Sequence, residues 1–165
     1  MQAVILAAGA SSRFYPFSEG KHKALFRIMD KPLIEYTLES LEKAGVKEVI
    51  IVLSPGQELR VKSKLKLRFV VQEEPKGMGD ALEHCREFLK DKFILLSPYH
   101  FNANEFIEPM MKKADETGAS AVLIAQETTT PWKYGMLELK GDKAVKIVEK
   151  PEKGKEPSNK KVLSI

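Results

Sequence analysis

Residues 2–13, QAVILAAGASSR, decide the fold that is predicted for this chain. The first part, residues 2–8, is a short continuous apolar run, which is typical of a strand covered on both faces in a parallel sheet. The second part is a loop of small residues that ends at Arg13 and stays irregular as far as Lys23. Ligands of open α/β sheets bind beyond the carboxyl ends of the strands, so this loop is predicted to border a ligand site.

Outward from this stretch, strand-like and helix-like patterns alternate along the chain. Apolar residues recur at helical spacing between Pro32 and Gly45, which are a favoured first residue and a favoured terminator of a helix. The alternation predicts an α/β, three-layer Rossmann-like domain with a mostly parallel sheet. The expected strands after the first are 48–53, 67–71, 93–96 and 119–125, and the expected helices are 33–44, 57–66, 79–90 and 106–116.

The pattern changes after Thr128. Residues 136–139 and 144–148 alternate around a turn at 140–143, which predicts a β-hairpin. A lysine-rich stretch follows, and an apolar tetrad at 162–165 predicts a strand that begins where the sequence stops. We therefore expect one domain over residues 1–165 that is incomplete at its C-terminus.

Composition narrows the class of protein. Apolar residues make up 43% and charged residues 30%, as in a water-soluble globular domain, and no apolar run approaches the roughly 20 residues that span a bilayer. The net charge of +4 is mild and scattered, which argues against nucleic acid as a partner. One cysteine, Cys85, excludes a disulfide within the chain and fits a reducing compartment. We expect a cytoplasmic protein with no membrane partner.

The loop after the first predicted strand has the chemistry of a phosphate site. Small residues let backbone N–H groups approach an anion closely. Arg13 adds a guanidinium that can hold phosphate oxygens in bidentate fashion, and Lys23 adds a point charge. The loop is neither a P-loop nor a Gly-x-Gly-x-x-Gly fingerprint, since neither pattern of residues is present.

The residues of this loop resemble the signature of the sugar-1-phosphate nucleotidyltransferases, which include uridylyl-, thymidylyl- and guanylyltransferases. The resemblance covers nearly the whole chain, and its motifs occur in the order that the family has them. The matching segments are Leu6-Ala7-Ala8-Gly9-Ala10-Ser11-Ser12-Arg13, Lys23-Ala24-Leu25, Lys31-Pro32-Leu33, Gln72, Gly77-Met78-Gly79-Asp80-Ala81, Tyr134-Gly135, Glu149-Lys150-Pro151 and Ser158-Asn159.

The tetrad Ser11-Ser12-Arg13-Phe14 is also similar to molybdenum-cofactor nucleotidyltransferases and to cytidylyltransferases of isoprenoid synthesis. Arg13 and Lys23 are ten positions apart, which is the span expected of the sugar-phosphate enzymes. The molybdenum-cofactor type has a much shorter gap. The spacing therefore favours the sugar-phosphate branch of the resemblance.

The resemblance implies transfer of a nucleotidyl group from a nucleoside triphosphate to a sugar 1-phosphate, with pyrophosphate as the other product. It implies that Arg13 and Lys23 are catalytic and that both belong to the nucleotide-binding set. That set is completed by Leu6, Ala7, Ala8, Gly9, Ala10, Ser11, Ser12, Gln72 and Gly77. The implied sugar-phosphate-binding residues are Gly135, Glu149, Lys150 and Asn159. The base, the sugar, the oligomeric state and any further C-terminal domain stay open, and a homo-oligomer is among the options.

The resemblance also implies a magnesium ion, but its ligands are not evident. The family ends the fourth strand with Gly-Asp, whereas this chain has Pro98 and Tyr99 there, and a phenol is a poor ligand for a hard divalent cation. The family's second metal-binding aspartate lies beyond residue 165. Three explanations stay open: another group such as Asp80 or Asn102 binds the metal, the residues were changed or the chain cut, or the protein is a paralogue that binds nucleotide or sugar phosphate without turnover.

Overall fold

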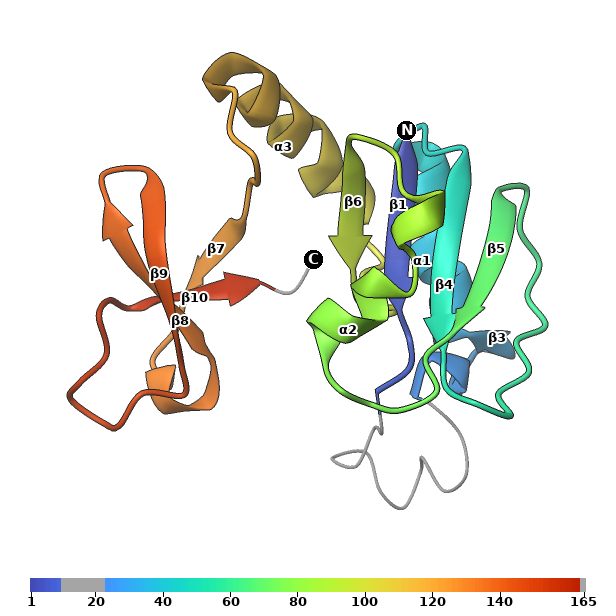
Figure 1. Ribbon diagram of the computed structural model, residues 1–165, viewed down its shortest axis with the longest axis horizontal. Coiled ribbons are helices and arrows are strands. Elements are labelled where there is room, and N and C mark those ends of the chain that lie inside the picture. The colour runs from blue at the N-terminus through green and yellow to red at the C-terminus, as the bar shows by residue number, and fades with distance from the viewer. Residues whose placement is uncertain (10–22, 164–165) are drawn as a thin grey trace. The chain divides into compact units, whose positions relative to one another are not determined.

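The structure is a computed structural model that describes residues 1–9 and 23–163. The chain divides into two compact units, Met1–Pro109 and a second that begins at Met110 (Figure 1). The division falls inside helix α3 (Ala103–Thr117). Each unit has a four-stranded sheet of its own, one parallel and one antiparallel.

The sheet of the first unit is entirely parallel. It consists of β1 (Gln2–Leu6), β4 (Glu48–Leu53), β5 (Lys66–Val71) and β6 (Phe93–Leu96), in the spatial order β5-β4-β1-β6. β1 and β4 are the two inner strands, and both are buried along almost their whole length. The apolar run that opens the chain is therefore a central strand, as its composition predicted.

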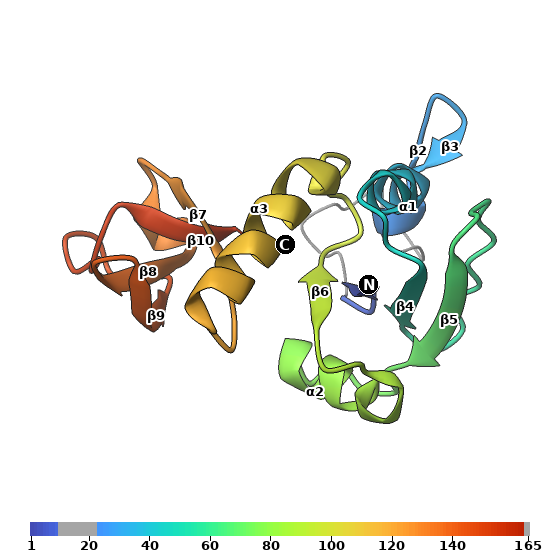
Figure 2. The ribbon, with the colours of Figure 1, turned by 90° about the horizontal axis from the view of Figure 1, so that it is seen from above.

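Helices cover both faces of this sheet. Figure 2 shows α1 (Leu33–Lys43) above one face, and α2 (Met78–Glu83) with the 3-10 helix η3 (Arg86–Phe88) beneath the other. The arrangement of helix, sheet and helix confirms the predicted three-layer α/β fold.

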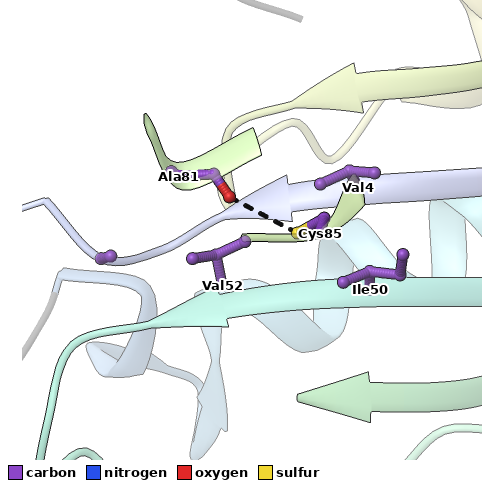
Figure 3. Close-up of a cluster of buried hydrophobic side chains, with 6 residues drawn as sticks. Val4, Ile50, Val52, Ala81 and Cys85 are labelled. Carbon is purple, nitrogen blue, oxygen red and sulfur yellow. Dashed lines mark hydrogen bonds between the residues drawn. The ribbon is translucent and has the colours of Figure 1, made fainter. Parts of the chain in front are cut away.

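The core on the α2 side is built from alternate residues of the strands, because side chains two positions apart face the same side of a sheet. Val4 of β1 and Ile50 and Val52 of β4 point to the same face and pack with Ala81 and Cys85 (Figure 3). The Cys85 thiol is fully buried and lies 3.5 Å from the carbonyl oxygen of Ala81. Burial raises the pKa of this thiol, so Cys85 is a packing residue and not a reactive nucleophile.

The ends of α1 lie where Pro32 and Gly45 predicted them. Gly45 has a φ of 77°, and its N–H donates to the carbonyl of Glu42, while the Val46 N–H donates to the carbonyl of Leu41. These two bonds are a Schellman motif, which terminates a helix on a left-handed residue. Most buried residues of α1 fall on one face at helical spacing: Ile34, Thr37, Leu38 and Leu41; Ser40 is buried as well.

The start of α3 is tied to α1 within the first unit. The hydroxyl of Ser40 donates to the side-chain oxygen of Asn104 at 2.7 Å and accepts from the backbone N–H of Asn104 at 3.0 Å. α3 begins at Ala103, earlier than the predicted helix, and Pro109 lies inside it. Within the described part of the chain, no helix combines the length and the apolar character that crossing a membrane requires.

The second unit has a small antiparallel sheet. Its strands are β7 (Ile124–Glu127), β8 (Gly135–Lys140), β9 (Lys143–Glu149) and β10 (Lys160–Leu163), in the order β7-β10-β8-β9. A short 3-10 helix, η4 (Pro131–Lys133), precedes β8. β8 and β9 form the predicted hairpin, and Gly141 at its turn has a φ of 58°.

Three elements differ from the predictions. Residues 57–65 are not helical, because Leu59 and Val61 alternate with polar residues and Gln57 instead caps a turn by accepting from the Ser54 N–H. The predicted helix at 79–90 is broken into α2 and η3. The predicted fifth strand starts late, as β7, and belongs to the antiparallel sheet because it pairs with β10.

A two-stranded hairpin was also missed. β2 (Arg27–Ile28) and β3 (Lys31–Pro32) pair antiparallel just before α1. Met29 and Asp30 both have left-handed backbone, with φ values of 49° and 61°, which is the conformation of a tight primed hairpin turn. Two-residue strands are too short to produce an alternating sequence pattern, so the signal was absent.

Candidate functional site

The carboxyl ends of four parallel strands meet at one edge of the first unit. Along the chain the strands run β1, β4, β5 and then β6, which returns to the far side of β1. The reversal between β1 and β6 is a topological switch point, where open α/β sheets bind ligands. The loop after β1 leaves from this point, as the sequence predicted.

Hydrogen bonds hold the first residues of that loop in place. The Ala7 N–H donates to the carbonyl of Val52 at 2.8 Å, and the hydroxyl of Ser54 donates to the carbonyl of Ala8 at 2.8 Å. Ala7 and Ala8 are buried, whereas Gly9 is exposed. β4 thus holds the first turn of the loop against the sheet edge.

The predicted phosphate-binding residues are only partly within the described chain. Leu6 ends β1, and Ala7, Ala8 and Gly9 follow it at the sheet edge. Lys23 opens the 3-10 helix η2 (Lys23–Leu25), but its side chain is not among the described groups. The convergence of Arg13 and Lys23 on one anion therefore stays a prediction. Ala10, Ser11, Ser12 and Arg13 lie outside the described residues.

Gln72 lies just past the end of β5 and is only 5% exposed. Its backbone N–H donates to the carbonyl of Leu53, which anchors it to the sheet. Its side-chain nitrogen donates to the carbonyl of Gly77 at 3.1 Å and to a carboxylate oxygen of Asp80 at 2.6 Å. The structure thus brings together the two residues, Gln72 and Gly77, that were predicted to contact the base.

The backbone conformation at residue 77 requires glycine. Its φ of 105° and ψ of −179° lie in a region that is essentially closed to residues with a Cβ. A Cβ at this position would meet no atom within 4 Å, so free space is not the constraint. The conformation turns the Gly77 carbonyl toward Gln72 and starts α2 at the next residue.

On the sugar side, Gly135 and Glu149 are direct partners across β8 and β9. A Cβ on Gly135 would lie 3.0 Å from a carboxylate oxygen of Glu149, 3.2 Å from a methyl of Ile147 and 3.4 Å from a methyl of Val162. Glycine at 135 therefore leaves the Glu149 carboxylate room to lie over the strand. The strand register places these two predicted residues together.

Lys150 follows Glu149 with strained backbone. Its φ is 44°, which is unusual for a residue with a side chain, and its N–H donates to the carbonyl of Tyr134 at 3.0 Å. Its ammonium lies 3.7 Å from the Glu149 carboxylate. Backbone strain of this kind clusters at functional sites, which agrees with the role predicted for Lys150.

Asn159 is held by its neighbours. The carbonyl of Asn159 accepts from the Thr128 N–H at 2.9 Å, and the adjacent Ser158 hydroxyl donates to the carbonyl of Leu137 at 2.6 Å. These bonds seat the start of β10 beside β7 and β8. Asn159 therefore directly precedes β10, in the same small unit as Gly135 and Glu149.

The residues after β6 do not form a magnesium site. Ser97, Pro98 and Tyr99 follow the strand, and none carries a carboxylate. In the described portion of the chain, no three His, Cys, Asp or Glu side chains are grouped as a metal requires. Of the two substitutes considered, Asp80 is bonded to Gln72, and the Asn102 amide donates to Glu105 at 3.3 Å. The donor set does not match what Mg²⁺ prefers.

Asp80 and Tyr134 lie in motifs that the sequence analysis quoted, but their contacts were not predicted. Asp80 was considered only as a metal ligand, yet it holds the amide of Gln72. Tyr134 accepts from Lys150, and its ring lies 4.3 Å from the ammonium of Lys161. Neither contact has a local signature, because each joins residues from different elements. A cavity of about 430 Å³ beside β5, lined by Arg27, Glu35 and Phe69 among others, contains none of the predicted site residues.

Sequence comparison finds a family model described as "Nucleotidyl transferase" that matches residues 2–162. A glucose-1-phosphate thymidylyltransferase of Xanthomonas campestris pv. campestris is 29% identical over 163 residues, which cover 92% of this chain and 55% of the relative. A bifunctional sugar-1-phosphate nucleotidylyltransferase/acetyltransferase of Sulfurisphaera tokodaii is 32% identical over 156 residues, covering 92% and 37%. The chain thus spans about half the length of the first of these relatives.

Solved structures show the same fold. A UTP-bound UGPase from Acinetobacter baumannii superposes with a TM-score of 0.82 at 20% identity, over 99% of this chain and 72% of that one. A UDP-glucose pyrophosphorylase in complex with UDP-glucose gives a TM-score of 0.77 at 20% identity, over 99% and 73%. At such identities the likeness establishes the fold alone.

Proposed function

Because the chain belongs to the nucleotidyl transferase family, we propose that it transfers a nucleotidyl group from a nucleoside triphosphate to a sugar 1-phosphate. The products are a nucleotide sugar and pyrophosphate. The observation that carries the proposal is the family match over residues 2–162, which includes both the loop after β1 and the Gly135–Glu149 pair. The names of the relatives, a glucose-1-phosphate thymidylyltransferase among them, agree with it.

The reaction asks little covalent chemistry of the protein. An oxygen of the sugar 1-phosphate attacks the α-phosphorus of the triphosphate, and the bond to the pyrophosphate oxygen breaks. Catalysis of this kind consists of holding two anions in line and offsetting the charge that builds between them. We assign the second task to Arg13 and Lys23, and assign the anion cradle to the backbone N–H groups of residues 8–12. The Ala7 N–H, which the sequence also offered as a donor, is instead bonded to the carbonyl of Val52.

The remaining residues orient the two substrates. Gln72 presents a buried carboxamide for the edge of the base, and Gly77 lets the base pack against bare backbone. On the other substrate, the Glu149 carboxylate accepts hydrogen bonds from sugar hydroxyls over Gly135, and Lys150 neutralises the sugar phosphate. Asn159 contacts the sugar ring from the start of β10.

We propose that magnesium enters as the counter-ion of the triphosphate. The residues after β6 supply no carboxylate for it, so the charge that this chain itself provides comes from Arg13, Lys23 and Lys150. We further propose that the protein works in the cytoplasm, since its single cysteine is a buried free thiol.

The test is an assay of pyrophosphate release. The purified protein is incubated with magnesium and each combination of five nucleoside triphosphates with a panel of sugar 1-phosphates. We expect turnover for at least one pair and a loss of at least about 100-fold in Lys23→Ala, because the lysine acts on charge that develops in the transition state. Lys21→Ala, two residues away in the same loop, is the matched control and should keep its activity.

Two outcomes contradict the proposal. Nucleotide binding by calorimetry without turnover for any pair would identify a binding protein instead of a transferase. Turnover that is unchanged in Lys23→Ala would mean that the loop after β1 does not serve the reacting phosphates.

A further inference from the structure

Gln72 is polar and yet almost entirely buried, at 5% exposed. The free energy of burying a carboxamide is offset only where its hydrogen-bonding groups find partners. Its nitrogen has two, the carbonyl of Gly77 and the carboxylate of Asp80, at 3.1 Å and 2.6 Å. Its oxygen, Oε1, accepts no hydrogen bond from any residue in the described parts of the chain. The side chain is thus satisfied on one end only.

The two partners determine which end of the Gln72 amide is the nitrogen and which is the oxygen. A carbonyl oxygen and an ionised carboxylate can only accept, so the group facing α2 must be the NH₂ of Gln72. Both of its protons are then committed, one to Gly77 and one to Asp80. A flipped amide would bring its oxygen against two other oxygens, which excludes that orientation. Oε1 is consequently the one free polar atom of this side chain.

We propose that Asp80 is a positioning residue that sets base specificity: it fixes the Gln72 amide so that the base meets an acceptor and no donor. The inference rests on the proposed function. An acceptor suits bases whose ring nitrogen on the pairing edge carries a hydrogen, which are uracil, thymine and guanine. Cytosine and adenine present a lone pair at that ring position, which Oε1 opposes, and only their exocyclic amino group is left as a donor on this edge. Asp80 therefore selects nucleotides with a ring N–H and disfavours CTP and ATP.

Asp80 is needed for this positioning because the Gln72 amide would otherwise be free to rotate. The terminal torsion of glutamine is broad and nearly two-fold, so an untethered amide can present either its oxygen or its nitrogen. The Gly77 carbonyl alone engages one proton and leaves the second for the base. The Asp80 carboxylate removes that second proton, and its bond is the shorter of the two.

The experiment compares Asp80→Ala with Glu83→Ala on the same helix. Glu83 is an acidic residue paired with Arg86 and 65% exposed, so it controls for loss of a negative charge near the site. The ratio of kcat/KM for the best of UTP, dTTP and GTP to that for CTP and ATP is measured for each protein. We expect the ratio to fall about tenfold or more in Asp80→Ala, because a wrongly paired polar group discriminates strongly, and to stay unchanged in Glu83→Ala.

Two further variants separate positioning from a structural effect. Asp80→Asn keeps an acceptor of the same shape and should lose less discrimination than Asp80→Ala, and it also serves if the alanine variant does not fold. In a Gln72→Ala background, Asp80→Ala should have no further effect on the ratio, since Asp80 acts through Gln72. Additive losses in the double variant overturn the inference.

The outcomes also distinguish this inference from the function on which it rests. A protein that binds no nucleoside triphosphate contradicts the proposed function itself. A protein that turns over a sugar 1-phosphate with a nucleotide ratio that is the same in Asp80→Ala refutes only the role of Asp80. A wild-type preference for CTP or ATP refutes it as well.

Discussion

The proposed base side and the proposed sugar side of this chain hold their side chains in different ways. Gln72 is 5% exposed and bonded to two partners, whereas the side chains of Glu149 and Lys150 are 68% and 58% exposed and contact mainly each other. A planar base can be selected by a few groups that are fixed in advance. The proposed sugar-phosphate site instead offers exposed charges, placed by the register of β8 and β9 and by the bond from the Lys150 N–H to the Tyr134 carbonyl.

The comparison predicts different failures on the two sides. On the base side, a substitution should act by releasing a group that is already bonded. On the sugar side, it should act by displacing a side chain that only the neighbouring strand keeps in place. A substitution at Gly135 tests the sugar side of this distinction most directly.

Gly135→Ala should have the largest effect. The new Cβ lies 3.0 Å from the Glu149 carboxylate, which must move away from the strand. The shift that this contact requires is a few tenths of an ångström, and catalysis is sensitive to small displacements of positioning groups, so we expect kcat/KM for the sugar 1-phosphate to fall about tenfold or more. The dissociation constant of the nucleotide, measured by calorimetry, should be unchanged.

The control for this substitution is Gly79→Ala in α2. A Cβ there meets no atom within 4 Å, and the backbone of Gly79 is not left-handed. The variant should keep the wild-type kcat/KM for sugar 1-phosphate and raise the free energy of unfolding by up to about 1 kcal/mol, as alanine does in helices. Equal losses in both variants would contradict the account of the sugar side.

Gly77→Ala should act on stability. Its backbone lies where a Cβ is strained by about 1–3 kcal/mol, although no atom stands in the way. We expect the free energy of unfolding to fall within that range in a denaturant titration. Gly56→Ala, with a φ of 72° in the ordinary left-handed region, should lose less. A larger loss at Gly56 would show that Gly77 is not the more constrained position.

Tyr99→Asp should add a carboxylate ligand for magnesium after β6, which the described residues there lack. A carboxylate after β6 is a suitable ligand for Mg²⁺, and the tyrosine phenol is not. We expect magnesium to strengthen nucleotide binding about tenfold more in the variant than in the wild type, measured by calorimetry with and without the ion. Tyr99→Asn is the control, because asparagine has the size of aspartate without its charge. An equal magnesium effect in all three proteins would mean that this position does not face the triphosphate.

Local signals in the sequence predicted the parts of the fold that local physics determines. The apolar run at β1, the Pro32 and Gly45 boundaries of α1 and the hairpin of β8 and β9 are all short-range features, and the structure confirms them. The predicted helix at 57–66 is wrong, because a basic polar segment was given a helical period that Leu59 and Val61 do not have.

The candidate site was less accessible to the sequence. Resemblance named Gln72, Gly77, Gly135 and Glu149, but it could not supply the contacts among them. The Asp80 bond joins the end of β5 to the first turn of α2, and the closeness of Gly135 to Glu149 depends on the register of two strands. Contacts of this kind depend on how elements are placed, and no spacing rule within one element encodes them. The roles of Arg13 and Lys23 stay predictions.

The smallest expected effect lies at the amino end of the sheet, away from both substrates. Glu48 opens β4, and its carboxylate is 2.8 Å from the ammonium of Lys90 and 3.7 Å from that of Lys66. The hydrogen bond from Lys90, with the charge of both lysines, holds the pKa of Glu48 below its usual value near 4.5. A lowered folded-state pKa stabilises the protein above that usual value, and the contribution is lost as the pH falls through the lowered one.

Glu48→Gln should therefore lower the midpoint of thermal unfolding slightly at pH 7, and the difference from wild type should shrink as the solution is acidified to about pH 3. Glu58→Gln, whose partner Arg60 is 90% exposed, is the control and should change little at either pH. Both variants should keep the wild-type KM for nucleotide and sugar 1-phosphate, since neither residue is among the predicted site residues. A difference that grows on acidification would show that the lysines do not stabilise the ionised form of Glu48.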